Sequence, residues 1–283
     1  MRGDRTAVVA NIARAAQAGD WHAKVETNDP QLDLAVQERL TTDYLRRRSG
    51  LAFKVNTAIA RLAMGAVTRL ETAQVDVIGR ENLTGITGGA IVTSNHFSPV
   101  ENMIVRKAVT PHRLMIVSQL TNLQMGGFLG YLMNYADTIP VSTSAHYMGR
   151  AFPTLLQQSL AAGRFILIYP EAEMWFNYTR PRPPMRGAYY YAARFGVPIV
   201  SCFVTMQSTA QPISADFNRV RFQMHILPTV QPVANATIAA NAKRMMAQDY
   251  AQKQAVFEAV YGRSATGPFI AKDIAGWQHA CMK

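Results

Sequence analysis

The chain has 283 residues, 49% of them hydrophobic, so it is long enough to bury a full core and fits one large domain with an appendage. Lys and Arg outnumber Asp and Glu by 29 to 18, and the net charge of +11 predicts anionic partners. No zinc-finger spacing, RNP-like segment or basic run interleaved with aromatics is present, so we expect no nucleic-acid partner and favour an anionic membrane surface.

The cysteines and the N-terminus indicate the compartment. Cys202 lies inside an apolar run and Cys281 lies next to the C-terminus, so the two do not form a disulfide framework. The first residues lack a continuous apolar stretch followed by a small-residue cleavage site. We therefore expect a protein that stays inside the cell.

The N-terminal part of the chain is predicted to be polar and then amphipathic. Residues 1–50 carry mixed charges, and we expect irregular structure or loose helices there, with no order assigned to the first thirty. Residues 51–70, LAFKVNTAIARLAMGAVTRL, have apolar side chains at helical spacing interrupted by basic ones. This helix either lies on an anionic bilayer or packs its apolar stripe on the core. Residues 1–75 are accordingly predicted to be a membrane-associating segment.

The remaining residues, 76–283, are predicted to form an α/β domain. Short apolar runs near residues 73–79, 89–95, 113–119, 137–142, 164–171, 197–206 and 220–227 are typical of strands that are covered on both faces. Helical segments are expected near residues 99–109, 121–134, 145–162, 186–196 and 236–261. The alternation predicts a largely parallel mixed sheet flanked by helices.

One uncharged stretch, residues 114–136, raises the question of a membrane span. Several Ser, Thr, Asn and Gln side chains and two adjacent glycines interrupt it. We therefore expect a peripheral or monotopic protein.

The segment SNHFSPVEN, residues 94–102, places a histidine and a glutamate five residues apart directly after a predicted strand. Ser98 and Pro99 predict a helix start, so His96 would lie on a strand-to-helix turn, where α/β sheets bind ligands. Glu101 could fix the tautomer of His96 and leave its other ring nitrogen free to accept a proton. The alternative is that Glu101 stabilises the helix N-terminus and His96 satisfies a loop carbonyl.

Further segments decide between these alternatives. SNHFSPVE resembles the NHxxxxD block of the lysophospholipid acyltransferase family, YPEAEMW at 169–175 resembles its FPEGTRS block, and GVPIVSCFV at 196–204 resembles its VPIVPV block. Residues 137–160 are similar in position to the block between the first two. The blocks occur in the right order over roughly residues 76–230. The resemblance implies a glycerolipid acyltransferase-like fold and an HxxxxE variant of the HxxxxD motif.

The resemblance also implies roles and partners. His96 would be the general base, Glu101 would orient it, Asn95 would shape the turn, and Glu171 would position the acceptor unless it is only a helix cap. The implied reaction moves a fatty acyl group from acyl-CoA or acyl carrier protein to a hydroxyl of a 1-acylglycerol-3-phosphate-like lysophospholipid, at the cytoplasmic face of the membrane. No cofactor besides the donor substrate is expected, and no histidine spacing suggests a metal. The oligomeric state is not indicated.

The sequence departs from the family pattern at three positions. Glu101 stands where Asp is usual, and Thr143 and Met174 stand where relatives that use glycerol phosphate have arginines. Losing two guanidiniums removes charge-assisted hydrogen bonds to a phosphate. The departures therefore favour, as alternatives, a glycolipid or other non-phosphate acceptor, or a non-catalytic lipid-binding relative.

The loop EAEMWFNYTRPRPPMRG, residues 171–187, is the predicted source of replacement contacts. Trp175 and its neighbouring aromatics would offer a surface for a lipid or sugar, and three arginines would supply charge. These arginines are Arg180, Arg182 and Arg186. The alternative for this loop is a solvated basic surface held by its aromatic side chains.

Overall fold

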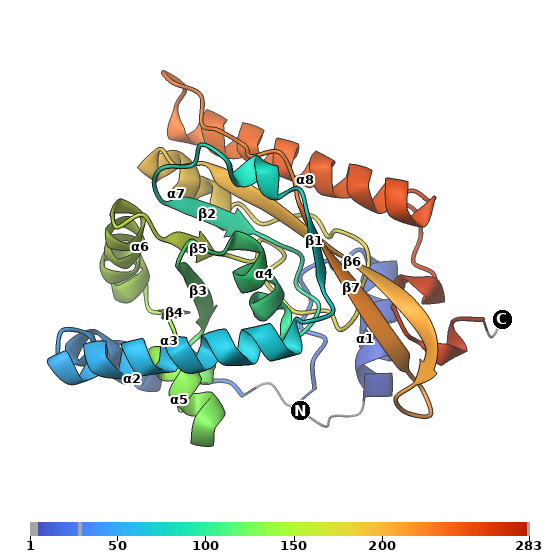
Figure 1. Ribbon diagram of the computed structural model, residues 1–283, viewed down its shortest axis with the longest axis horizontal. Coiled ribbons are helices and arrows are strands. Elements are labelled where there is room, and N and C mark those ends of the chain that lie inside the picture. Colours follow the sequence, from blue (N-terminus) through green and yellow to red (C-terminus); the bar gives the residue numbers. More distant parts are fainter. Residues whose placement is uncertain (1–4, 28–29, 282–283) are drawn as a thin grey trace.

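Seven strands form one sheet in the computed structural model, which describes residues 5–27 and 30–281 (Figure 1). Their order across the sheet is β1-β7-β6-β2-β5-β3-β4, and all neighbours are parallel except the antiparallel pair β6 and β7. The strands are β1 (Asp76–Ile78), β2 (Ala90–Thr93), β3 (Leu114–Gln119), β4 (Thr138–Val141), β5 (Phe165–Leu167), β6 (Ile199–Pro212) and β7 (Asn218–Ile226). Each predicted apolar run overlaps one of them, with β6 and β7 extending beyond their runs to Pro212 and Asn218, and the expected mostly parallel mixed sheet is confirmed.

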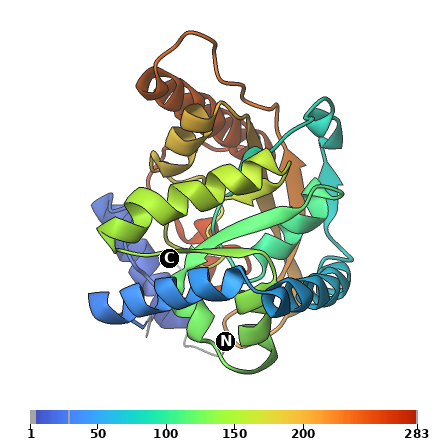
Figure 2. The same ribbon diagram turned by 90° about the vertical axis from the view of Figure 1, so that its left-hand side faces the viewer.

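Helices cover both faces of this sheet, as predicted. The α-helices are α1 (Arg5–Ala18), α2 (Leu34–Arg48), α3 (Leu51–Glu71), α4 (Glu101–Val109), α5 (Gly127–Tyr135), α6 (Phe152–Ala161), α7 (Gly187–Phe195) and α8 (Ile238–Tyr261). A π-helical turn at Tyr147–Ala151 precedes α6, and short 3-10 turns occur elsewhere. Helices α2 and α6 lie at the end of the molecule that faces the viewer in Figure 2.

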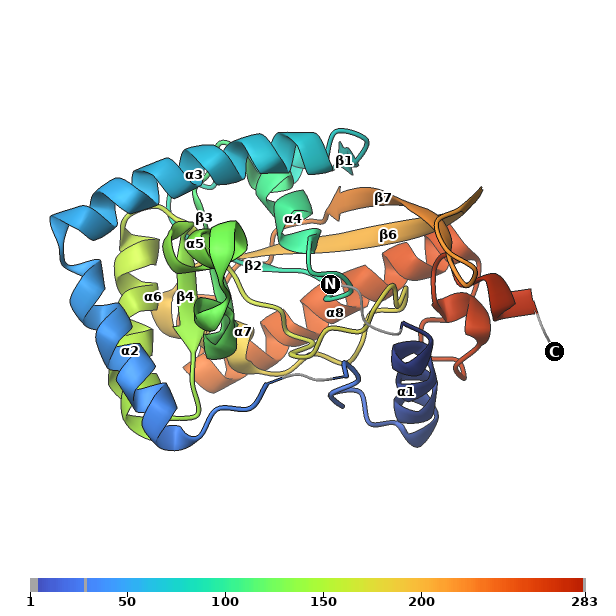
Figure 3. The same cartoon turned by 90° about the horizontal axis from the view of Figure 1, so that it is seen from below.

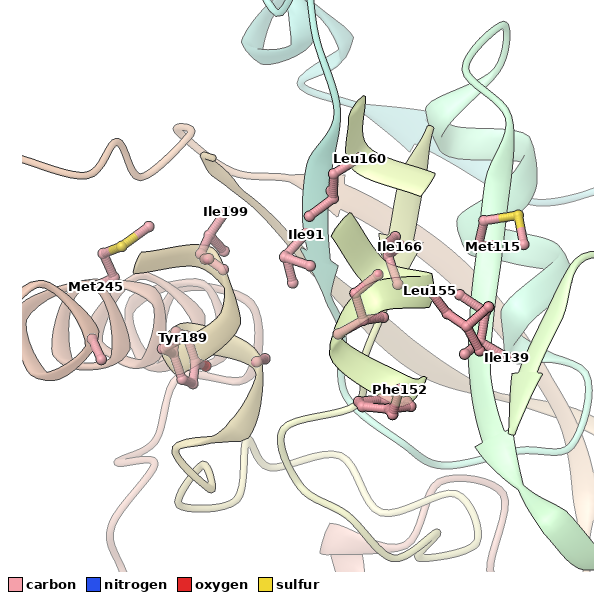
Figure 4. Close-up of a cluster of buried hydrophobic side chains, with 14 of the residues drawn as sticks. Ile91, Met115, Ile139, Phe152, Leu155, Leu160, Ile166, Tyr189, Ile199 and Met245 are labelled. Carbon is pink, nitrogen blue, oxygen red and sulfur yellow. The ribbon is translucent and has the colours of Figure 1, made fainter. Parts of the chain in front are cut away.

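The core consists of one apolar layer on each face, because successive side chains of a strand point to opposite sides. On one face, Ile91, Ile166 and Ile199 from three neighbouring strands pack against α6, α7 and α8 (Figure 4). On the other face, Val92 and Leu167 pack against α4. This two-sided burial explains why the strands are continuously apolar rather than alternating.

The N-terminal residues are more ordered than their composition suggests. Helix α1 buries Val8, Val9 and Ile12 in a cluster with Trp175 and Tyr178, so the absence of order expected for the first thirty residues is wrong over Arg5–Ala18. Tertiary contact supplies the order that local propensity does not. Helices α1 and α2 lie at opposite ends of the molecule (Figure 3). Residues 1–4, 28–29 and 282–283 and the side chain of Cys281 lie outside the described part.

Helix α3 packs part of its apolar surface on the core, which is one of the two alternatives considered for residues 51–70. One face packs Ala60 and Met64 against α4 and α5. A second apolar stripe, spaced as one helical face, is exposed and consists of Leu51, Val55, Ile59 and Leu62. Packing on the core therefore leaves a second apolar surface in contact with solvent. Among the described residues, no helix combines the length and apolarity needed to cross a bilayer.

A buried ionic network fastens α7 and α8 to the carboxyl end of β2. The carboxylate of Asp249 accepts hydrogen bonds from Thr93 Oγ1 at 3.0 Å, Tyr189 Oη at 2.5 Å and Lys253 Nζ at 2.9 Å. Lys253 Nζ also donates to Thr93 Oγ1 at 2.9 Å. Because Thr93 is the last residue of β2, the network fixes the point where the chain enters the turn that carries His96.

Candidate active site

The turn between β2 and α4 brings His96 and Glu101 into direct contact. His96 Nδ1 pairs with Glu101 Oε1, while the side chain of Glu101 is 1% exposed and that of His96 is 22% exposed. Within residues 5–27 and 30–281, no group is hydrogen-bonded to His96 Nε2. The histidine therefore has one ring nitrogen held by a buried carboxylate and the other available at the carboxyl edge of the sheet, where the sequence placed it.

Glu101 also holds the backbone of the turn. Its second oxygen, Oε2, accepts hydrogen bonds from the N–H groups of Phe97 and Ser98. The carboxylate lies in the first turn of α4, where the helix dipole favours a negative charge. Both alternatives for Glu101 therefore apply at once, since it orients the imidazole and also stabilises the helix N-terminus.

Tyr169 forms one wall of the site. Its ring stacks on the His96 imidazole with centroids 4.1 Å apart and planes inclined by 8°. Burial raises the pKa of the Tyr169 hydroxyl well above its usual value, and the nearby Glu101 carboxylate raises this pKa further. Tyr169 therefore stays a neutral phenol, and its ring limits the rotation of His96.

Glu171 joins the turn to the loop at residues 171–187. Its Oε2 accepts from the backbone N–H of His96 at 3.2 Å and from Arg182 Nε at 3.1 Å, and its Oε1 accepts from Arg182 N at 3.0 Å. Glu171 and Arg182 are both buried. With Glu101 engaged at Phe97 and Ser98, three consecutive N–H groups of the turn donate to carboxylates, so they do not serve a developing oxyanion.

Main-chain hydrogen bonds fasten the loop along the turn. Trp175 N donates to His96 O and Asn177 N donates to Phe97 O, each at 3.0 Å. The loop and the turn therefore behave as one unit, and a shift of either moves the imidazole.

Asn95 binds the protein rather than facing an open site. Its side chain accepts from Val204 N at 2.8 Å and donates to Val204 O at 3.0 Å, which reproduces a strand-like pair with β6. Asn95 is 1% exposed. Its side chain therefore clamps the turn to the neighbouring strand.

The structure places three of the proposed acceptor-binding side chains inside the protein. Trp175 is fully buried and donates from Nε1 to Ala23 O, and Arg182 stacks over the Trp175 ring at 4.5 Å and donates to Trp21 O. Arg180 pairs with Asp273 at 2.7 Å. The expectation that these side chains present a lipid- or sugar-binding surface is corrected, because each is satisfied by protein groups. The solvated-loop alternative fails for the same reason.

Arg186, Thr143 and Met174 have other surroundings. Arg186 is exposed at the start of α7, and Thr143 is exposed beyond the end of β4. Met174 is half-buried beside Trp175. Arg186 is therefore the one member of the predicted arginine trio whose guanidinium faces solvent.

Sequence reasoning missed two parts of the site. Tyr169 is the first residue of the YPEAEMW segment, which resembles a family block. The resemblance of this segment was therefore a signal that could have placed Tyr169 near His96. The N-terminal segment at Trp21–Ala23 covers Arg182 and Trp175, and it contains no sequence motif that predicts this contact. No cluster of three or more His, Cys, Asp or Glu side chains arranged for a metal is found among the described residues.

Comparisons with known proteins agree with this geometry. Residues 74–205 match a family model described as Acyltransferase. The crystal structure of the 1-acyl-sn-glycerophosphate (LPA) acyltransferase PlsC from Thermotoga maritima superposes with a TM-score of 0.51 over 90% of this chain and 95% of that one, at 14% sequence identity. No curated protein sequence matches the chain. At 14% identity, the structural likeness concerns the fold.

Asn95→Asp tests the clamp between the turn and β6. A carboxylate keeps the acceptor for Val204 N but loses the donor to Val204 O, so we expect the free energy of unfolding to fall by about 1–3 kcal/mol. Chemical denaturation measures this loss. Asn102→Asp, the same substitution in the first turn of α4, should leave stability within about 0.5 kcal/mol. Equal effects at the two positions would contradict the clamp.

Proposed function

We propose that this chain is a member of the lysophospholipid acyltransferase family and that it transfers a fatty acyl group from acyl-CoA or acyl carrier protein to a hydroxyl of a membrane lysophospholipid. The observation that carries the proposal is His96, with Nδ1 held by buried Glu101 and Nε2 unengaged at the carboxyl edge of the sheet. An imidazole so oriented removes a proton from an alcohol that the substrate itself supplies.

The reaction follows from that orientation. His96 Nε2 takes the proton of the acceptor hydroxyl as the hydroxyl oxygen bonds to the thioester carbonyl carbon. Collapse of the tetrahedral intermediate breaks the carbon–sulfur bond, and the imidazolium returns the proton to the leaving sulfur. The products are an ester and a free thiol. Glu101 favours the imidazolium through its negative charge, and Tyr169 keeps the ring in plane.

His96→Ala should lower kcat by roughly 100- to 10,000-fold, because general-base catalysis contributes on that order. Glu101→Gln should also lower kcat, whereas Glu101→Asp keeps the carboxylate and should retain more activity. Thiol release and labelled lipid product, measured together, follow the reaction. Thermal unfolding checks that each variant is folded.

The outcomes separate the proposal from its alternatives. Unchanged turnover in His96→Ala would contradict the proposed role of His96 as the general base. A wild-type protein that binds lipid without releasing thiol would instead be the non-catalytic lipid-binding relative.

A second candidate acceptor is a glycolipid or another lipid without phosphate. It is favoured because two arginines of the loop are already paired with carboxylates of the protein. Arg180 and Arg182 are committed to Asp273 and Glu171, and Met174 stands where relatives have a phosphate-linked arginine. An acceptor phosphate near His96 would therefore find fewer guanidiniums than in those relatives.

An acceptor panel assayed with one donor distinguishes the two candidates. If the acceptor carries no phosphate, 1-acylglycerol 3-phosphate and a neutral monoacyl glycolipid of the same chain length should differ by less than about tenfold in kcat/KM. Truncating the exposed Arg186 to Gln should then change neither rate. A strong preference for the phosphate-bearing lipid, lost in Arg186→Gln, would dismiss the neutral acceptor.

We also propose that α3 docks the enzyme on the cytoplasmic face of the membrane. Its exposed stripe, defined by Leu51, Val55, Ile59 and Leu62, is bordered by Lys54 and Arg61 of the same helix. An apolar stripe with a basic border suits the headgroup region of an anionic leaflet. The bilayer would bring the lipid acceptor to the enzyme.

The double substitution of Ile59 and Leu62 by Gln tests this docking. Both side chains are more than half exposed, so their loss costs the free protein little, while vesicle binding should weaken roughly tenfold or more. Co-sedimentation with vesicles that contain anionic lipid measures the change. Ile213→Gln, an equally exposed site on the hairpin between β6 and β7, is the matched control. The same loss in the control would contradict docking through α3.

A further inference from the structure

A basic hollow lies at the edge of the sheet opposite His96. It encloses about 340 Å³ between α2, α3 and the residues that immediately precede three parallel strands. Its charged lining consists of Arg48, Lys54, Arg61, Arg113, Arg164 and Asp137. Arg113, Asp137 and Arg164 precede β3, β4 and β5, so the hollow lies at the amino ends of these strands, whereas His96 follows the carboxyl end of β2. The two sites are therefore separate.

The charges of this hollow do not balance. Five cations surround one carboxylate, and that carboxylate, Asp137, is already bound by Arg113 Nε at 3.0 Å and Arg61 Nε at 3.3 Å. Among the described residues, the hydrogen-bond partner of the Arg48 side chain is the neutral Tyr44 hydroxyl, at 2.7 Å. In the described part of the chain, neither Lys54 nor the guanidinium of Arg164 has a hydrogen-bonded or ion-paired partner. The excess positive charge therefore lacks an anion.

The surroundings make that excess costly. Burial lowers the pKa of Arg164, and repulsion from Arg113 lowers it further, so the guanidinium would be stabilised by a negative neighbour. A second hollow of about 380 Å³ continues past Arg61 and Arg113 to Arg106. Arg106 Nε is buried without a hydrogen-bond partner. Its two terminal nitrogens donate to Leu114 O at 3.3 Å and Ala136 O at 3.5 Å, so Arg106 adds fixed positive charge to the wall of the second hollow.

Phosphate is the anion that suits this lining. It supplies several strong acceptor oxygens, and arginine forks bind it by paired, charge-assisted hydrogen bonds. Helix α3 indicates which molecule supplies this phosphate. It contributes Lys54 and Arg61 to the hollow and carries the exposed apolar stripe on the adjoining face. A lipid could place its headgroup in the hollow and its chains along that stripe.

We propose that this hollow binds the phosphate headgroup of an anionic phospholipid, at a site distinct from the one where acyl transfer occurs. The inference takes from the proposed function only the docking of α3 on a bilayer, and it does not depend on catalysis. Occupation of the hollow would set the depth and rotation of α3 at the membrane, since the headgroup would be gripped by both the helix and the sheet.

The test compares phosphatidylcholine vesicles with and without phosphatidic acid. Wild-type protein should bind the phosphatidic acid vesicles more tightly, and Lys54→Gln and Arg164→Gln should each lose roughly tenfold or more of that affinity, the loss expected for one charge-assisted hydrogen bond. Neither substitution removes a hydrogen bond or an ion pair between described residues. Arg69→Gln removes the same charge from an exposed position of α3 outside both hollows, and it should retain most of the affinity.

A second measurement separates the possible sources of phosphate. In calorimetry, short-chain phosphatidic acid below its micelle concentration should bind wild type and bind Lys54→Gln much more weakly. Tight binding of inorganic phosphate or coenzyme A that is lost in Lys54→Gln, with vesicle binding unchanged, would overturn the lipid source. Equal loss in Arg69→Gln, or no preference for phosphatidic acid, would overturn the site itself. Failure of the proposed catalysis would appear separately, as absent acyl transfer by wild-type protein.

Discussion

Two buried carboxylates determine the conformation of the turn on which the rest of the site depends. Glu101 binds the imidazole of His96 and the backbone N–H groups of Phe97 and Ser98, and Glu171 binds the N–H of His96 itself. A buried backbone donor without an acceptor is costly, so this turn keeps its shape only while both acids are present. The position of His96 is therefore a consequence of how the hydrogen bonds of the backbone are satisfied.

The Glu171 carboxylate depends on side chains from more distant parts of the chain. Buried Glu171 needs a cation, which Arg182 supplies from the proline-rich loop, and buried Arg182 in turn needs Trp21 O and the ring of Trp175. Trp175 is covered by the N-terminal segment and by α1. The first helix of the chain thus forms the back wall of a site whose chemistry lies in the middle of the sequence, because a desolvated ion pair must be enclosed.

The strands and the His96 turn were predictable because their signals are local. Apolar runs of the right length predict buried strands, and Ser98 with Pro99 predicts a helix start close to the observed one at Glu101. The environment of Arg180 and Arg182 was not predictable, since arginines in a proline-rich loop are usually solvated and their partners, Asp273 and Glu171, are set by tertiary pairing. The order of α1 was missed for the same reason. For α3, periodicity showed an apolar helix, but only the packed structure showed that the helix has two apolar faces.

The ionic network beneath β2 has a consequence for when the enzyme becomes complete. Thr93 and Asp249 are separated by 156 residues, and Arg180 and Asp273 by 93. During synthesis the catalytic strand emerges early, but its carboxyl end is not fastened until α8 has left the ribosome, and the loop beside it waits for the residues around Asp273. Until then, the turn that carries His96 lacks the support of Asp249 and Lys253 at its base. That support arrives only after α8 has been made, long after β2.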